Sequence, residues 1–394
     1  MNAREFTPVR NPGKPVSPTP YQQSIGPRGV GTSAAQTLLS TLPKGLGTSA
    51  ARAFRSTLPR VFDHEPDEGY IDRSWGDGSG PPLYLPAPER IDTALGDLLD
   101  ARVGEWGAEC GFDKEGSEEL RDNGFGRLAM LAHPDSDDTD QLMIAAWLNA
   151  AWWAADDRYA DDTDKGALPE KLPPRLMVAM MALDPLAPVG EFDPPLAERI
   201  RSEPVLAALQ SGVRYLAERG TPAQVQRACY ASFAMFVSWT AYAAWRHTEK
   251  YPPTWEYLAA RQHDSFFTSM TLVDPVGGYE LPANVFYDPD VRRLANQAGL
   301  ASVVLNDLVS VTKDAADEKP LPNMVLQIAA DRRCSLSDAT EITVDLHNQL
   351  VRDFRDGHRR MREVPMPELQ RFLRGVRAWM GGGAEWHITA ARYR

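Results

Sequence analysis

The chain has 394 residues with a formal net charge of −12, and 43% of its residues are hydrophobic and 24% charged. These values are typical of a globular protein, and the acidic balance argues against nucleic acid as a partner. The longest apolar stretch, residues 142–155, is too short to span a bilayer, and no segment resembles a secretory signal. The three cysteines show no CxxC spacing, which indicates reduced thiols. We therefore expect a cytoplasmic protein without a membrane span.

Residues 1–85 differ from the rest of the chain. Eight prolines occur by residue 59, with Gly, Ser and Thr between them. Few large apolar side chains are present to offset the entropy of ordering, so we expect a mostly disordered extension. Residues 31–43 recur with changes as residues 47–59, but two copies are too few for a solenoid. The Arg-rich start is also compatible with an organellar transit peptide, although its prolines argue against an amphipathic helix.

From residue 86 onward the spacing of apolar residues becomes helical. Proline pairs at 173–174 and 252–253 lie in the gaps where helices should end. No strands are predicted, so residues 86–394 are expected to form one all-α domain. Its predicted helices begin near residue 91 and then cover 116–132, 139–160, 175–183, 195–219, 222–247, 254–273, 289–314, 321–330, 335–362 and 366–381.

An acidic cluster follows directly after the apolar run 142–155. If the helix continues, Asp157 and Asp161 lie one turn apart, with Asp156 beside them at the rim. Taken alone, such a cluster is more often a solvated helix end than a metal site.

A second polar group lies on the helix predicted over 289–314. Asn306, Ser310 and Asp314 are four residues apart and share one face, with apolar neighbours that make an unneutralised carboxylate costly. Amide, hydroxyl and carboxylate oxygens suit Mg²⁺, which often shares its shell with phosphates. Two such faces, opposed in a bundle, could hold several Mg²⁺ ions on a diphosphate and improve it as a leaving group. Asp307 is expected to be a hydrogen-bonding partner rather than a ligand.

The DDxxxD element at 156–161 and the NDxxSxxxD element at 306–314 together resemble the metal-binding elements of bacterial class I terpene synthases. The resemblance implies an α-helical bundle that binds three Mg²⁺ ions and cleaves a small allylic diphosphate. It implies six metal ligands, which are Asp156, Asp157, Asp161, Asn306, Ser310 and Asp314. Asp314 departs from the family pattern, where glutamate is usual, so its carboxylate reaches one methylene less far.

Further positions match groups that contact the diphosphate in that family. Arg261 lies 45 residues before Asn306, where the family has a diphosphate-sensing arginine. Asp264 and Ser265 correspond to its linker and effector positions. The resemblance also implies that Lys313, Arg392 and Tyr393 contact the diphosphate and close the site.

Aromatic residues recur at helical spacing, which more often indicates core packing than a binding site. A cyclising carbocation nonetheless needs aromatic faces, so some of them should line the pocket. The residues considered are Trp152, Trp153, Phe233, Phe236, Trp239, Tyr242, Trp245, Phe266, Phe267, Trp379 and Trp386.

Residues 257–262 (YLAARQ) and 277–283 (GGYELPA) are similar to one subgroup of this family, which forms 2-methylisoborneol or 2-methylenebornane. The resemblance covers residues 86–394 and implies 2-methylgeranyl diphosphate as substrate and a C11 bornane product. Water would quench the last cation to the alcohol and proton loss would give the alkene, and no residue in the sequence decides between them.

Two alternatives stay open at this point. A cyclase of geranyl or farnesyl diphosphate would share every diphosphate-binding motif. A non-catalytic helical binding module would form no product. A trans-prenyltransferase fits less well, because that class normally pairs two Asp-rich elements. The sequence does not reveal the oligomeric state, but homodimers are common in the family.

Overall fold

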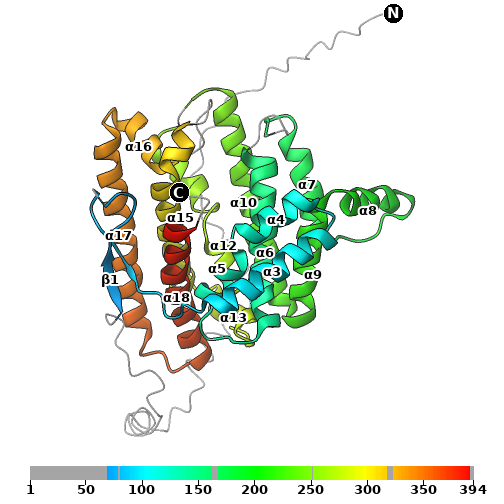
Figure 1. Cartoon of the computed structure of the whole chain (residues 1–394), viewed down its shortest axis with the longest axis horizontal. Coiled ribbons are helices and arrows are strands. Elements are labelled where there is room, and N and C mark those ends of the chain that lie inside the picture. Colours follow the sequence, from blue (N-terminus) through cyan, green and yellow to red (C-terminus); the bar gives the residue numbers. More distant parts are fainter. Residues whose placement is uncertain (1–68, 79, 162–166, 251, 317–322, 391–394) are drawn as a thin grey trace, which may run out of the picture. The chain divides into compact units, whose positions relative to one another are not determined.

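The computed structural model describes residues 69–394, apart from residues 79, 162–166, 251, 317–322 and 391–394 and the side chain of residue 161. The repeat and most of the predicted extension lie outside the described residues. Within the described part the chain is almost entirely helical (Figure 1), which confirms the predicted all-α class. None of the helices in this part combines the length and apolar character that crossing a membrane requires.

A short antiparallel hairpin, which the sequence did not predict, precedes the helices. Its strands are β1 (Tyr70–Arg73) and β2 (Leu83–Pro86), with Tyr70 opposite Pro86. The Tyr84 amide donates to Asn348 Oδ1 at 2.7 Å, which attaches the hairpin to a late helix. Strands of four residues are too short to show the alternation of polar and apolar residues that predicts a strand. The hairpin depends on this tertiary contact, which the local sequence does not reveal. The predicted domain boundary between residues 85 and 86 stays a prediction, although the described chain is already regular at β1.

The helices follow the predicted order closely. They are α3 (Thr93–Glu109), α4 (Lys114–Asp122), α5 (Phe125–Ala132), α6 (Thr139–Ala155), a π-helical turn η1 (Asp156–Asp161), α7 (Leu172–Leu183), a 3₁₀ turn η2 (Gly190–Phe192), α8 (Asp193–Ser202), α9 (Pro204–Arg219), α10 (Pro222–His247), α11 (Thr254–Arg261), α12 (Phe267–Met270), α13 (Val273–Val276), α14 (Ala283–Phe286), α15 (Pro289–Ala316), α16 (Met324–Arg332), α17 (Leu336–Met361) and α18 (Pro367–Thr389).

Three predicted helices are divided in the structure. The segment 116–132 breaks at Gly124, whose φ of +74° is left-handed. The segment 195–219 breaks before Pro204, where Glu203 is extended, because proline disfavours helical geometry at the preceding residue. The segment 254–273 ends its first helix at Arg261 and begins again at Phe267. This last break shapes the polar site described below.

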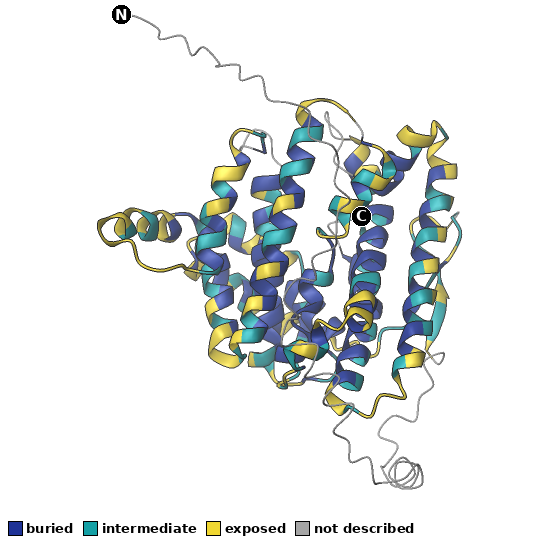
Figure 2. Cartoon of the chain, turned by 180° about the vertical axis from the view of Figure 1, so that it is seen from behind, coloured by how far each residue is buried: buried dark blue, intermediate teal, exposed yellow. Residues whose placement is uncertain are grey.

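Two long helices, α6 and α15, form the centre of the structure. Helix α6 is apolar on all sides and buried, as the stretch 142–155 predicted, and packs against α9. Helix α15 packs against α17 and α18 (Figure 1). Figure 2 shows that both have mostly buried surfaces, whereas the outer helices expose one side. Side chains from α6 and α15 can therefore meet in the interior.

Candidate active site

Most of the predicted site residues line one cavity between α6, α10 and α15. The structure brings together residues from three separate segments of the chain, which are Asp156, Arg261, Asp264, Ser265, Asn306, Ser310, Lys313 and Asp314. These residues are up to 158 positions apart in the sequence. If the two acidic motifs form one metal site, they must meet in the folded chain in this way. The roles predicted for the individual residues remain hypotheses.

Helix α15 provides the polar wall of this cavity. Asn306, Ser310 and Asp314 lie on its inner face, as their four-residue spacing predicted. Ser310 Oγ donates to Asp314 Oδ2 at 2.6 Å, and the Asp314 residue is only 8% exposed. Among the described residues Asp314 forms no ion pair, and its buried carboxylate lines the cavity. This donor set fits a hard divalent cation.

Asn323, which the sequence did not single out, supports this wall from the start of α16. Its Nδ2 donates to Asp314 Oδ2 at 2.8 Å and to the Asp307 carbonyl oxygen at 2.8 Å. Its Oδ1 accepts from the Val325 amide at 2.9 Å and so caps α16. An asparagine just before a predicted helix was a signal for the cap, but nothing local indicated the contact with Asp314.

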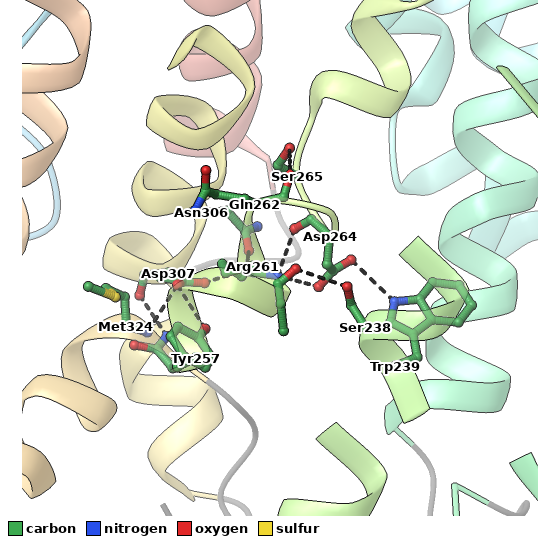
Figure 3. Close-up of polar contacts among 12 residues, drawn as sticks. Ser238, Trp239, Tyr257, Arg261, Gln262, Asp264, Ser265, Asn306, Asp307 and Met324 are labelled. Atoms are coloured by element: carbon green, nitrogen blue, oxygen red, sulfur yellow. Dashed lines mark hydrogen bonds and ion pairs between the residues drawn. The ribbon is translucent and has the colours of Figure 1, made fainter. Parts of the chain in front are cut away.

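Arg261, the last residue of α11, lies beside the polar wall (Figure 3). Its Nη1 is 2.6 Å from Asp264 Oδ2, and its Nη2 forms an ion pair with Asp307. Its Nη2 also lies 3.5 Å from Asn306 Oδ1. Burial alone would lower the pKa of Arg261, but the neighbouring carboxylates, Asp307 first, raise it well above its usual value. The guanidinium is thus a permanent cation at the edge of the cavity.

Asp307 is a buried partner of Arg261 rather than an outward-facing group. Its residue is 1% exposed, and its Oδ2 accepts from Tyr257 Oη at 3.2 Å and from the Met324 amide at 3.0 Å. Burial raises the pKa of its carboxyl to about 6, against the opposing effect of Arg261. This geometry agrees with the expectation that Asp307 is a hydrogen-bonding partner.

The break between α11 and α12 carries Asp264 and Ser265 to the cavity. Asp264 Oδ1 accepts from Trp239 Nε1 at 3.2 Å, so its carboxylate links α10 to Arg261 (Figure 3). Ser265 Oγ donates to the Gln262 carbonyl oxygen at 3.0 Å, which closes the turn. A continuous helix, as predicted over 254–273, would not present these consecutive residues in this way.

The opposite wall comes from α6 and η1. At Asp156 the α-helix becomes a π-helical turn, which the predicted continuous helix did not anticipate. Asp156 lines the cavity, whereas Asp157 lines a neighbouring groove beside Glu119 and Arg158. A π-turn contains more residues per turn, so consecutive side chains diverge from α-helical positions. The structure therefore separates two aspartates that were expected on adjacent positions of one metal-binding face.

Some predicted residues cannot be compared in this way. Arg392 and Tyr393 lie outside the described residues, as does the side chain of Asp161. Lys313 is exposed at the rim and lines both the cavity and the neighbouring groove. Within the described residues no group of three His, Cys, Asp or Glu side chains is placed to hold a metal. The amide and hydroxyl oxygens of α15 are further oxygen donors that line the cavity.

Aromatic and apolar side chains complete the cavity. Phe236 does not line the cavity and is buried in the core. Trp379 packs behind the cavity against Phe266, at 5.0 Å between ring centroids, and Trp386 packs against Trp153 at 5.4 Å. Of the aromatic residues considered from sequence, those that line the cavity are Trp152, Trp153, Trp239, Tyr242 and Phe266.

Similarity to known proteins identifies the family of the chain. Residues 148–353 match the model of terpene synthase family 2, C-terminal metal binding. The 2-methylisoborneol synthase of Streptomyces ambofaciens is 35% identical over 313 residues, which are 78% of this chain and 70% of that protein. The corresponding enzyme of Streptomyces griseus is 34% identical with the same coverage.

A solved structure supports the same assignment. The 2-methylisoborneol synthase of Streptomyces coelicolor A3(2), in complex with Mg²⁺ and 2-fluoroneryl diphosphate, superposes with a TM-score of 0.75. It is 32% identical, and the match covers 79% of this chain and 97% of that one. The chain belongs to the terpene synthase family, as a class I enzyme with the α-helical bundle that its two motifs predicted.

Proposed function

We propose that this terpene synthase converts 2-methylgeranyl diphosphate into a C11 bornane monoterpenoid with release of diphosphate. Its similarity to several 2-methylisoborneol synthases supports this substrate. The subgroup-like segments 257–262 and 277–283 also support it.

The single observation that carries the proposal is a cavity with two chemically different parts. One part has the carboxylate, amide and hydroxyl oxygens of α15 together with Arg261. The other is lined by the rings of Trp152, Trp153 and Phe266. A diphosphate requires the first environment and a carbocation requires the second. An allylic diphosphate is the class of substrate that needs both.

Mg²⁺ is the cofactor that the oxygen donors fit, and the solved relative was crystallised with it. We propose three ions, held by Asp156 on one wall and by Asn306, Ser310 and Asp314 on the other. Asp157 and Asp161 are ligands in the sequence prediction only, since Asp157 lines the neighbouring groove and the side chain of Asp161 lies outside the described residues. When bound, Mg²⁺ neutralises charge on the diphosphate and so makes it a better leaving group.

Cationic side chains of the protein would complete diphosphate recognition. The Arg261 guanidinium can turn donors from Asp264 to phosphate oxygens while its ion pair with Asp307 keeps it in place. Lys313 lies at the rim, where it can reach the same group. Arg392 and Tyr393 are proposed to close the site over the bound substrate.

After ionisation the protein's task is to fold the cation and exclude water. Aromatic faces attract positive charge through their quadrupoles and present no nucleophile. Trp153 packs on Phe266 at 5.6 Å between ring centroids, so this surface is held by ring stacking. Recapture of the diphosphate would permit isomerisation before ring closure to a bornyl-type cation.

The test is incubation of the purified full chain with Mg²⁺ and, separately, 2-methylgeranyl, geranyl and farnesyl diphosphate. Volatile products are identified by gas chromatography and mass spectrometry, and diphosphate release is measured in parallel. We expect a C11 bornane product from the methylated substrate, and none with a chelator. C10 or C15 products alone would keep the enzyme class but replace the substrate. No product from any of the three would favour a binding module.

We also propose a homodimer, supported by an apolar outer surface on α10. Tyr230 and Val237 lie seven residues apart on this helix and are 57% and 67% exposed. Exposed apolar positions at this spacing form one stripe, which a second copy could cover. Analytical ultracentrifugation should give twice the chain mass, and Val237→Glu should give a monomer. The cytoplasmic location and the lack of a nucleic-acid partner remain predictions.

A further inference from the structure

Three polar residues interrupt the apolar part of the cavity. Asn149, Thr268 and Ser269 line it beside Trp152 and Phe266. All three are buried, with residue exposures of 1%, 3% and 4%. Apolar side chains of similar size would pack there without the cost of burying polar groups. Their presence therefore needs an explanation other than core packing.

These residues have hydrogen-bond donors and acceptors that no described residue uses. Ser269 Oγ donates to Asn149 Oδ1 at 2.5 Å, and Asn149 Nδ2 donates to the Ala145 carbonyl oxygen at 2.8 Å. This leaves a second amide hydrogen on Asn149 and the lone pairs of Ser269. Thr268 Oγ1 has no hydrogen-bond partner among the described residues although it is buried. Together the three offer donors and acceptors to one small polar molecule.

Their position is displaced from the proposed diphosphate site along α6. Asn149, Trp152, Trp153 and Asp156 all line the cavity and recur at helical spacing on one face. Asn149 precedes Asp156 by seven residues, which on an α-helix is about 10 Å along the axis. A group held at Asn149 would therefore meet the hydrocarbon part of a bound substrate and not its diphosphate.

We propose that Asn149, Thr268 and Ser269 hold the water molecule that quenches the final carbocation, so that the product is an alcohol. This inference rests on the proposed function. The water would donate one hydrogen bond to Ser269 Oγ and accept from Asn149 Nδ2 or Thr268 Oγ1, which leaves a lone pair for the cation. Because the same side chains immobilise it, the water is kept from the cation until ring closure brings the charge to it.

The chemical step balances with groups that the reaction itself supplies. The water oxygen forms a bond to the cationic carbon and becomes a protonated alcohol. One of its O–H bonds then breaks, and the proton is finally taken up by the released diphosphate. The overall change is prenyl diphosphate plus water giving alcohol plus hydrogen diphosphate.

Another hydroxyl in the cavity is a competitor for this role. Tyr242 Oη also has no hydrogen-bond partner among the described residues. Its ring lies 6.2 Å between centroids from that of Tyr257, and burial first, then the charge of Asp264, raises the pKa of Tyr242 well above its usual value. It is thus near the proposed diphosphate site, where a water would meet the first allylic cation and give an acyclic alcohol.

The test is the product distribution of Thr268→Val, which removes the hydroxyl and nearly preserves side-chain shape. With 2-methylgeranyl diphosphate we expect the ratio of bornane alcohol to alkene to fall roughly tenfold, the change expected from losing one hydrogen bond. Diphosphate release should stay within about threefold, because the leaving-group contacts are untouched. Thr268→Ser should restore the alcohol, and Ser269→Ala should reduce it. In H₂¹⁸O the wild-type alcohol should carry the label.

Controls separate this role from a structural one. Thr343→Val removes another buried hydroxyl, which on α17 donates only within its own helix, at 2.7 Å to the Ala339 carbonyl oxygen, and it should leave the ratio unchanged. An unchanged ratio in both Thr268→Val and Ser269→Ala would overturn the inference, as would loss of alcohol in Tyr242→Phe alone or a wild-type product that is only alkene. Absence of diphosphate release by the wild type would instead refute the proposed function.

Discussion

The two polar walls of the cavity differ in how their ligand residues are held. On α15, Ser310 and Asp314 are hydrogen-bonded to each other, and Asn323 fixes Asp314 from the start of α16. On the opposite wall the helix changes to a π-turn at Asp156, and Asp156 and Asp157 line separate hollows. The α15 wall is therefore preorganised within the described chain, whereas the η1 wall presents one aspartate to the cavity.

This difference has a physical origin in the contacts of each segment. Helix α15 continues through its motif, so a regular 3.6-residue repeat sets the direction of each side chain. The η1 turn is held instead by contacts of its non-acidic residues, since Tyr159 donates to Glu203 and Arg246 donates to the Ala160 carbonyl oxygen at 2.9 Å. These contacts thus come from Tyr159 and Ala160 and not from an acidic ladder along one helix face.

The largest effect is expected from Arg261→Ala, which removes the cation that joins the α15 wall to α11. We expect diphosphate release to fall by roughly three orders of magnitude, because a buried cation directed at the leaving group is lost. Asp307 would also be left buried without its ion pair, so the melting temperature should fall. Arg293→Ala removes an exposed ion pair from the same helix α15 and should change neither quantity. Retained turnover in folded Arg261→Ala would contradict the assigned role.

A smaller and unequal effect is expected from the two aspartates at the end of α6. Asp156→Asn should reduce turnover by roughly a hundredfold, because a charged oxygen facing the cavity is replaced by an amide. Asp157→Asn should have an effect of about threefold, because its side chain lines the neighbouring groove. Steady-state rates over a range of Mg²⁺ concentrations measure both. Equal losses would show that both aspartates act at the metal site when substrate binds, as the sequence motif predicted.

The sequence predicted the helical order and the α15 face well, because both depend on local periodicity. It did not predict the splitting of Asp156 and Asp157, since nothing local distinguishes a π-turn from a continuing α-helix in this stretch. Asn323 was missed for a related reason, because its contact with Asp314 joins separate helices. The hairpin at β1 and β2 was also missed, because its partner Asn348 is 264 residues from Tyr84.

Asn323 gives a third prediction, about support rather than ligation. Asn323→Ser keeps a side-chain acceptor that can cap α16 but loses the amide that donates to Asp314. We expect the Mg²⁺ concentration for half-maximal rate to rise by about tenfold, as is usual when a group that orients a ligand is removed. Asp113→Ala, which removes the cap of α4, should lower stability without changing the Mg²⁺ dependence. An unchanged Mg²⁺ dependence in Asn323→Ser would show that the α15 wall is organised without this contact.

The smallest effect concerns the pH dependence of stability, which reflects the burial of Asp307 on α15. The pKa of Asp307 is raised by burial to about 6, above its ordinary value of 3.8. The folded chain therefore binds this proton more tightly than the unfolded chain, and the resulting stabilisation is complete below about pH 4 and is lost as pH rises through about 6. This stabilisation amounts to at most on the order of 3 kcal/mol.

Asp307→Asn cannot titrate at this position. Its free energy of unfolding, measured by denaturant titration from pH 4 to 7, should therefore lack the decline in stability expected for the wild type. Asp290→Asn, at an exposed position of α15, should keep it. If the wild type gained stability relative to Asp307→Asn as pH rose, Arg261 would dominate over burial, and the wall would have to be regarded as an ion-pair network that is stabilised by charge.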